Sequence, residues 1–272
     1  AREEFEAEGR SMIFMDANEN PFESDVNRYP DPMQRELKKE ISQWRGVDEN
    51  QIYLCNGSDE FISNVIMGCC EPGRDSIMIL PPTFGMYKVS AKTYGVGIQE
   101  VPLIKSFQLD IESILKTADE NSKIIFIPTP NNPTGNNFNF ETIELLIQRF
   151  PGIVVVDEAY AEFSSNSSVI PWLLKYPNLM VCQTFSKAQG MAGARLGMAF
   201  AHRDFINFFN RIKAPYNINS LTINVALKRI KEQDRVNTQV DLLLRERKRL
   251  EEAFAEIPFI KKCFPSDANF LL

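Results

Sequence analysis

The chain has 272 residues, 44% of them hydrophobic, and its 36 acidic and 30 basic side chains give a net charge of −6. This length can bury one large domain, or one domain and part of a second. The acidic balance argues against nucleic-acid recognition, which begins from a basic face. No apolar run approaches the roughly 20 residues needed to cross a bilayer, and the charged residues 1–9 lack the apolar segment of a secretion signal. We therefore expect a cytoplasmic protein that acts on small molecules.

The five cysteines and the single histidine limit the kinds of metal site, disulfide and catalytic triad that the chain can form. Two cysteines are adjacent and no pair has C-x-x-C spacing, which favours reduced core cysteines over a disulfide framework or a zinc site. A lone histidine, His202, is a poor basis for a metal site or a Ser-His-Asp triad. We therefore expect no bound metal and no hydrolytic triad.

The first 32 residues are rich in turn formers. Asn18-Glu19-Asn20-Pro21 and Asn27-Arg28-Tyr29-Pro30-Asp31-Pro32 contain prolines that exclude a continuous helix. A polar arm of this kind packs across its own domain or across a partner subunit, and the alternative is a frayed terminus. Apolar spacing over 34–44 then predicts the first helix.

From residue 52 onward, apolar runs alternate with helical patterns. The expected strands are 52–55, 76–80, 97–103, 123–128, 153–156, 179–184 and 196–201. The expected helices are 61–70, 89–94, 111–118, 141–150, 205–212, 222–231 and 236–256. This alternation predicts an α/β fold with a mostly parallel, mixed sheet between helices. The last residues, 269–272, have the pattern of a further strand at its beginning.

One strand is followed by Thr184-Phe185-Ser186-Lys187. The lysine therefore lies at the carboxyl end of a strand, where open α/β sheets bind their ligands. Its amine can form an imine with an aldehyde, while Ser186 and Arg195 can hold a phosphate. The alternative is a surface loop with an ordinary solvated lysine.

The strand 52–55 leads into Asn56-Gly57-Ser58-Asp59-Glu60 and then into a helix. Free backbone N–H groups at the positive end of that helix can bind a phosphate. Ser58 and Asp59 are also good N-cap residues, so the alternative is simply a capped helix.

Three further strand ends carry side chains suited to a ring-shaped ligand. Phe84 could stack on a planar ring, although such an aromatic is more often part of the core. Asn132 precedes Pro-Thr-Gly in a turn that can aim its amide inward. Asp157 would need a cationic partner when buried, and a protonated ring nitrogen would serve; Tyr160 could reach the same ligand. Because all these residues would share one edge of the sheet, we expect a single site.

Together these residues resemble the fold-type I pyridoxal-phosphate enzymes, the aspartate aminotransferase superfamily. The resemblance covers 16–195 and extends more loosely to the end, and it is strongest toward the histidinol-phosphate aminotransferase family. That finer resemblance rests mainly on the two N-terminal stretches and on Pro215-Tyr216-Asn217. The supporting segments are Asp16-Ala17-Asn18-Glu19-Asn20-Pro21, Asn27-Arg28-Tyr29-Pro30-Asp31-Pro32, Asn56-Gly57-Ser58-Asp59-Glu60, Pro130-Asn131-Asn132-Pro133-Thr134-Gly135, Asp157-Glu158-Ala159-Tyr160 and Thr184-Phe185-Ser186-Lys187-Ala188.

The resemblance implies pyridoxal 5'-phosphate as cofactor, with Lys187 bound to its aldehyde and then acting as general base and acid. Asp157 would keep the ring nitrogen protonated, and Asn132 and Tyr160 would hydrogen-bond the ring oxygen. Phe84 would stack on the ring, where the family commonly has tyrosine. Tyr29 and Asn132 would also contact the substrate. The phosphate would be bound by Ser58, Asp59, Thr184, Ser186, Arg195 and, from the partner subunit, Tyr29.

The resemblance also implies an obligatory homodimer with a shared active site. The family reaction converts L-histidinol phosphate and 2-oxoglutarate into imidazole acetol phosphate and L-glutamate, in histidine biosynthesis. The implied domains are an N-terminal arm or small-domain part at 1–32, a large cofactor-binding domain at 33–214, and linking helices with the start of an incomplete α+β small domain at 215–272. Alternatives are a related enzyme, such as a threonine-phosphate decarboxylase or an aromatic aminotransferase, and a non-catalytic cofactor-binding paralogue.

Two departures from the family pattern bear on activity. The family's C-terminal region, with an arginine for the carboxylate of glutamate, has no counterpart after Leu272. Its N-terminal segment with a substrate-facing tyrosine has none before Ala1. We expect a truncated or partly ordered form rather than a crippled enzyme, because 269–272 looks like a strand cut short.

Overall fold

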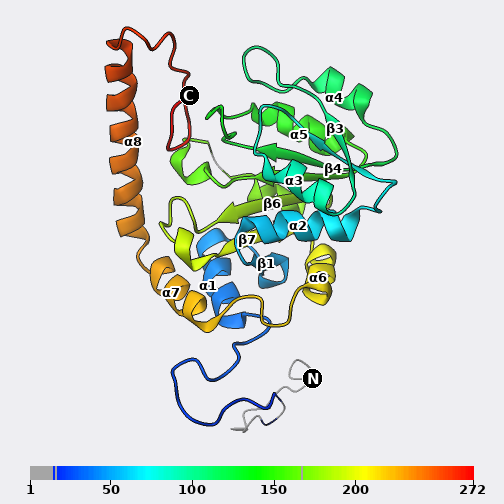
Figure 1. The fold of residues 1–272 in the computed structure, drawn as a ribbon, viewed down its shortest axis with the longest axis vertical. Coiled ribbons are helices and arrows are strands. Elements are labelled where there is room, and N and C mark those ends of the chain that lie inside the picture. Colours follow the sequence, from blue (N-terminus) through cyan, green and yellow to red (C-terminus); the bar gives the residue numbers. More distant parts are fainter. Residues whose placement is uncertain (1–14, 16, 167) are drawn as a thin grey trace.

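The computed structural model describes residues 15, 17–166 and 168–272. Within them, seven strands form one mixed sheet in the order β1-β7-β6-β5-β4-β2-β3, with helices on both sides (Figure 1). The strands are β1 (Ile52–Cys55), β2 (Ser76–Ile79), β3 (Gly97–Glu100), β4 (Ser122–Pro128), β5 (Ile153–Asp157), β6 (Leu179–Thr184) and β7 (Gly197–Ala201). The predicted mixed α/β sheet is confirmed.

The helices follow the predicted order, and their ends lie within about one turn of the predicted ones. They are α1 (Arg35–Arg45), α2 (Ser58–Cys69), α3 (Met86–Thr93), α4 (Ile111–Thr117), α5 (Phe140–Arg149), α6 (Arg203–Ile212), α7 (Ser220–Ile230) and α8 (Gln233–Ala255). Short 3₁₀ turns connect several elements, including η3 (Ala161–Phe163), which follows β5.

The sheet is covered on both faces, which explains the nearly continuous apolar runs of its central strands. In β4, Ile125 and Ile127 belong to the core that α1, α4, α5 and α7 share, whereas Ile124 and Phe126 belong to the core of α2, α3 and α6. All four side chains are fully buried. Burial of each such side chain contributes about 1.5–3 kcal/mol, so packing on both faces fixes the sheet that carries the site.

Among the described strands, β7 alone runs opposite to the others. It pairs antiparallel with β6 and β1, and Gly197 lies opposite both Thr184 and Cys55. The start of β7 therefore lies at the edge where β1 and β6 end. As a result Arg195, which precedes β7, lies beside the residues that follow the other two strands.

The tail differs from the sequence expectation, because residues 259–272 form no strand. Phe270 packs edge-on against Tyr160, with ring centroids 5.2 Å apart. Ala268 is fully buried in a small cluster with Val236 and Val240 of α8. The backbone N–H of Phe264 donates to the carbonyl of Leu272, so the tail folds back on itself. Side-chain packing against Tyr160 and α8 takes the place of sheet hydrogen bonds.

The arm and α8 lie outside the sheet and its covering layers. The described part of the arm extends away from the sheet, and α8 runs along one side of the molecule (Figure 1). Phe22, Val26 and Tyr29 of the arm are all exposed. Asp16 and the charged residues 1–9, which entered the sequence expectations, lie outside the described residues. No described helix is both long and apolar enough to cross a membrane.

Candidate active site

A cavity of about 220 Å³ lies at the edge of the sheet where β4, β5 and β6 end. It draws its walls from segments that are distant in sequence. The residues named from the sequence that line it are Ser58, Asp59, Phe84, Asn132, Asp157, Tyr160, Thr184, Ser186, Lys187 and Arg195. The structure thus brings together every candidate site residue except Tyr29.

Asp157, the last residue of β5, provides a buried carboxylate that is 6% exposed. Its Oδ2 accepts a hydrogen bond from the Tyr87 hydroxyl at 2.6 Å, and its Oδ1 accepts one from the Ala159 backbone N–H at 3.0 Å. Burial raises the pKa of Asp157, while these hydrogen bonds and the charge of Lys187 oppose the rise. No described cation lies within ion-pair distance of this carboxylate. A cationic group in the cavity would therefore stabilise its charged form.

Lys187, Tyr160 and Asn132 converge from three loops. Lys187 is exposed in the turn after β6, and its Nζ lies 5.2 Å from the centroid of the Tyr160 ring. The Tyr160 hydroxyl accepts a hydrogen bond from Asn132 Nδ2 at 3.1 Å. An ammonium over an aromatic face is favourable. The arrangement places an amide and a phenol, both able to donate to a ligand oxygen, on the same cavity wall as a primary amine.

The N-terminus of α2 faces this cavity through Ser58 and Asp59. Its N-cap residue is Gly57, with φ 76°, and no side chain caps the helix. The interpretation that Ser58 or Asp59 caps α2 is therefore wrong. The N–H groups of the first turn carry the positive end of the helix dipole and lack intrahelical partners.

Two glycines allow a close approach of the groups around that helix end. A Cβ at Gly57 would lie 2.5 Å from Arg195 Nη2, and a Cβ at Gly197 would lie 2.5 Å from the Ser58 backbone nitrogen. Only glycine at both positions leaves room for the helix end, the guanidinium and β7 together. The result is a cradle of backbone N–H groups and one cation, which suits a phosphate.

Arg195 enters the cradle from a strained backbone position, with φ 53° and ψ 56°. Its Nη1 donates to the Ala192 carbonyl at 3.1 Å, and its Nη2 lies 3.6 Å from Asp59 Oδ2. Both charged side chains are about half exposed, so this pair contributes little to stability. The guanidinium keeps further donors for an anion.

Thr184 lines the same cavity, and its hydroxyl is also hydrogen-bonded within the turn after β6. Its hydroxyl accepts a hydrogen bond from the Ser186 backbone N–H at 3.1 Å and donates to the Leu196 carbonyl at 3.4 Å. In this arrangement the threonine shapes the turn that presents Ser186 and Lys187 to the cavity.

Tyr29 does not line this cavity. Its ring stacks on Tyr216 with centroids 4.3 Å apart, and both residues line a separate hollow beneath the arm. The predicted contact of Tyr29 with a partner's cofactor stays a prediction.

Tyr87, which was not predicted as a site residue, lines the cavity, and its hydroxyl donates to Asp157. Burial, and then the neighbouring Asp157 charge, raise the pKa of Tyr87 well above its usual value, so the phenol stays a donor. Its ring stacks on Phe126, with centroids 4.4 Å apart. The available signal was its spacing, because a residue three positions after Phe84 at the start of a helix can share the same side.

Comparisons with known proteins identify the family. The family model described as aminotransferase class I and II matches residues 15–272. The histidinol-phosphate aminotransferase of Flavobacterium psychrophilum is 47% identical over the whole chain, which spans 78% of that relative's length.

Two solved structures share the fold. The histidinol-phosphate aminotransferase of Clostridium acetobutylicum superimposes with a TM-score of 0.83 at 26% identity, covering 91% of this chain and 74% of that one. The enzyme of the same name from Sinorhizobium meliloti, in complex with pyridoxal-5'-phosphate, gives 0.84 at 23% identity, covering 91% and 67%. Because the family model covers nearly the whole chain and a relative aligns along its full length, the chain belongs to the class I and II aminotransferase family.

Proposed function

We propose that the protein is a pyridoxal-phosphate-dependent transaminase that exchanges the amino group between L-histidinol phosphate and 2-oxoglutarate. The products are imidazole acetol phosphate and L-glutamate, in histidine biosynthesis. The observation that carries the proposal is the 47% identity over the whole chain to a relative named for this activity. The cavity supports it because it has an amine, a buried carboxylate and an anion cradle on one wall.

The chain's own residues fit pyridoxal 5'-phosphate. Asp157 is buried without a cationic partner within ion-pair distance among the described residues, so it could pair with a protonated ring nitrogen. The uncapped start of α2, with Arg195 beside Gly57, suits a phosphate. The amine of Lys187, on the same cavity, suits an aldehyde.

Bound pyridoxal phosphate supplies an electron sink that stabilises negative charge at the substrate's α-carbon. The Nζ of Lys187, an amine on the cavity wall, takes the proton from the substrate's α-carbon and holds it. The same Nζ would then give the proton up again within the cavity. Its exposure to the cavity leaves the side chain free to turn between the two positions.

Asp157 keeps the ring nitrogen protonated through charge pairing in a site shielded from water. Tyr87 orients the carboxylate through the 2.6 Å hydrogen bond. Asn132 and Tyr160, already hydrogen-bonded to each other, donate to the ring oxygen. Phe84 would cover one face of the ring, and its edge-on contact with Tyr87 (centroids 5.6 Å apart) holds the Phe84 side chain in place.

Ser58, Asp59, Thr184, Ser186 and Arg195 bind the phosphate, and Thr184 also shapes the turn that carries Ser186. Tyr29 completes this set from a partner subunit, and Tyr29 with Asn132 contacts the substrate. We accordingly propose a homodimeric cytoplasmic enzyme. Its arm spans 1–32, its cofactor domain 33–214, and 215–272 begins a second domain. The exposed apolar residues of the arm support this proposal, since they suit a partner surface.

The test is a comparison of kcat/KM for L-histidinol phosphate, L-threonine phosphate and L-phenylalanine, each with 2-oxoglutarate. We expect histidinol phosphate to be preferred by at least about tenfold, the value of one discriminating contact. Equal or lower turnover of histidinol phosphate would contradict the substrate assignment. Carbon dioxide release from threonine phosphate would point instead to a decarboxylase.

A further inference from the structure

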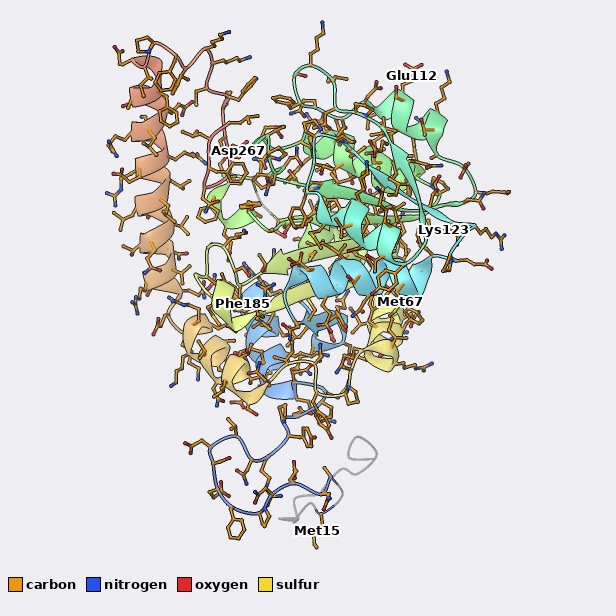
Figure 2. The ribbon with its side chains drawn as sticks, in the orientation of Figure 1. Met15, Met67, Glu112, Lys123, Phe185 and Asp267 are labelled. Carbon is orange, nitrogen blue, oxygen red and sulfur yellow. The ribbon has the colours of Figure 1, made fainter. Side chains whose placement is uncertain are left out.

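Two buried side chains anchor the turn that carries Lys187. They belong to the residues two positions before and two positions after the lysine. Phe185 is fully buried, and its ring centroid lies 5.9 Å from that of Trp44; Figure 2 labels Phe185 beside α1. Gln189 is also fully buried, and its Nε2 donates to Glu162 Oε1 at 2.9 Å. Lys187 between them is exposed to the cavity. The flanks of the turn are therefore fixed while the lysine is left free to move.

Both side chains are connected to the last turn of α1, Phe185 directly and Gln189 through Glu162. Arg45 Nη2 donates to the same Glu162 Oε1 at 2.8 Å, and the two side chains are 17% and 24% exposed. The guanidinium carbon of Arg45 lies 3.6 Å from the centroid of the Trp44 ring. Trp44 thus supports one flank of the turn by packing, and Arg45 supports the other through Glu162. Partial burial strengthens this charged contact relative to an exposed pair.

Glu162 also lies two positions after Tyr160, the aromatic residue that Lys187 approaches. It is the central residue of η3, which directly follows Tyr160, and the Phe163 N–H donates to the Tyr160 carbonyl at 3.0 Å. One carboxylate therefore joins the turn that carries Tyr160 to the turn that carries Lys187. Across the cavity wall, these two residues meet at 5.2 Å from Nζ to the ring centroid.

The amide of Gln189 has a second partner. It exchanges hydrogen bonds with Gln233, the first residue of α8, at 3.4 Å and 3.2 Å. Gln189 thus uses its amide fully, with Glu162 on one side and Gln233 on the other. Because the side chain is fully buried, loss of one partner would leave a buried polar group unsatisfied.

We propose that Glu162, acting through Gln189, is a positioning residue that sets the orientation of Lys187 relative to Tyr160. The proposal rests on the proposed function, since it assigns Lys187 the proton transfer. Removing the charge of Glu162 weakens its bonds to both Arg45 and Gln189. The Lys187 turn then samples more conformations, and the amine spends less time where it can reach the reacting carbon.

The test compares Glu162→Gln, Gln189→Met and the double variant with the wild-type protein loaded with its cofactor. The control is Glu112→Gln, which removes the same charge from an exposed position on α4, away from the site (Figure 2). The measurements are kcat and KM for L-histidinol phosphate, the melting temperature, and hydrogen exchange of the peptide 185–191. That peptide includes the Gly190 and Met191 amides, which are bonded to the carbonyls of Lys187 and Phe185.

We expect Glu162→Gln to lower kcat about tenfold, the value of one hydrogen bond to a charged group, with KM nearly unchanged. Exchange of 185–191 should accelerate by a similar factor. The double variant should be no worse than the poorer single variant, because both changes break the same connection. The control should match the wild type in all four measurements.

A lower melting temperature with unchanged kcat and unchanged local exchange would overturn the proposal, since Glu162 would then be only structural. Additive losses in the double variant would also overturn it, because Glu162 would not be acting through Gln189. If the wild-type protein turns over no amino donor, the proposed function fails. The exchange comparison still decides whether Glu162 holds the turn.

Discussion

Asp157 shows how one residue can combine burial with chemistry. Burial raises the pKa of its carboxyl, and two hydrogen bonds and the charge of Lys187 hold that rise in check. A cationic ring nitrogen would complete the set of partners and make the charged form stable. The neighbouring Tyr87 keeps the carboxylate in place without supplying a positive charge.

Replacing Asp157 by asparagine should separate these contributions. Asp157→Asn keeps the shape but cannot hold a proton on the ring nitrogen, so kcat should fall about 100-fold, or ~2.7 kcal/mol in activation free energy. Cofactor affinity should change far less, because the phosphate cradle is untouched. Steady-state kinetics and a cofactor titration measure the two. Equal losses would mean that Asp157 acts mainly as an anchor.

Single residues at strand ends were the most predictable part of the site. Lys187, Asp157 and Asn132 were found because each follows an apolar run, and chemistry-bearing side chains rarely follow several such runs by accident. Tyr87 of α3 was missed because its role depends on a hydrogen bond to Asp157 at the end of β5. Its spacing from Phe84 could have placed it near the cavity, but the local sequence does not show a contact with Asp157.

At the scale of elements, α1 carries a buried lysine whose charge should lower stability. Lys38 is 6% exposed. Its burial and then the nearby Lys213 charge lower the pKa of Lys38 to about 8. Between that pH and the ordinary lysine pKa near 10.4, the unfolded chain binds more protons than the folded one, so stability rises with pH over this range. Below about pH 8, the folded protein carries the full cost of the buried charge.

Lys38→Met removes this cost and keeps most of the apolar stem. We expect the variant to be more stable than the wild type at pH 7 by up to about 3 kcal/mol, with the advantage shrinking toward pH 10. Urea unfolding at pH 7 and pH 9.5 measures the difference. Lys39→Met, at an exposed position of the same helix, is the control. A Lys38→Met advantage independent of pH would show that burial of the charge is not its cause.

Helices and strands were predictable where the local residue pattern determines them. They were less predictable where pairing between strands determines them. Residues 124–127 are apolar on both faces, as expected for a covered central strand. The predicted strand 97–103 ends at Glu100, although Val101 and Leu103 still donate to the carbonyls of Ile79 and Pro81. The expected beginning of a strand at 269–272 is not formed, since no described strand pairs with these residues and Phe270 packs on Tyr160. The antiparallel direction of β7 depends on its neighbours, so the local sequence could not supply it.

At the scale of the whole molecule, the fold class was predictable from the alternation of strands and helices. That alternation does not predict where the arm lies. The described arm leaves the sheet, and Tyr29 stacks on Tyr216 rather than on the cavity of its own chain. An arm with exposed apolar residues is suited to a second subunit. The active site would then be completed only in the dimer.

Mixing two inactive variants tests this sharing. Lys187→Ala and Tyr29→Ala should each be strongly impaired alone. If Tyr29 serves the neighbouring site, each mixed dimer contains one intact site, so subunit exchange should restore about a quarter of wild-type activity. The activity of the mixture is measured against unmixed samples at the same total concentration. No gain, despite mixed dimers verified by mass spectrometry, would confine Tyr29 to its own chain.

The visible absorption spectrum of the purified protein, recorded before and after L-histidinol phosphate is added, tests cofactor, lysine and substrate together. We expect a yellow band that is absent from Lys187→Ala and that bleaches when the substrate donates its amino group. A band that ignores histidinol phosphate would contradict the substrate assignment. No band even after pyridoxal phosphate is added would contradict the cofactor site itself.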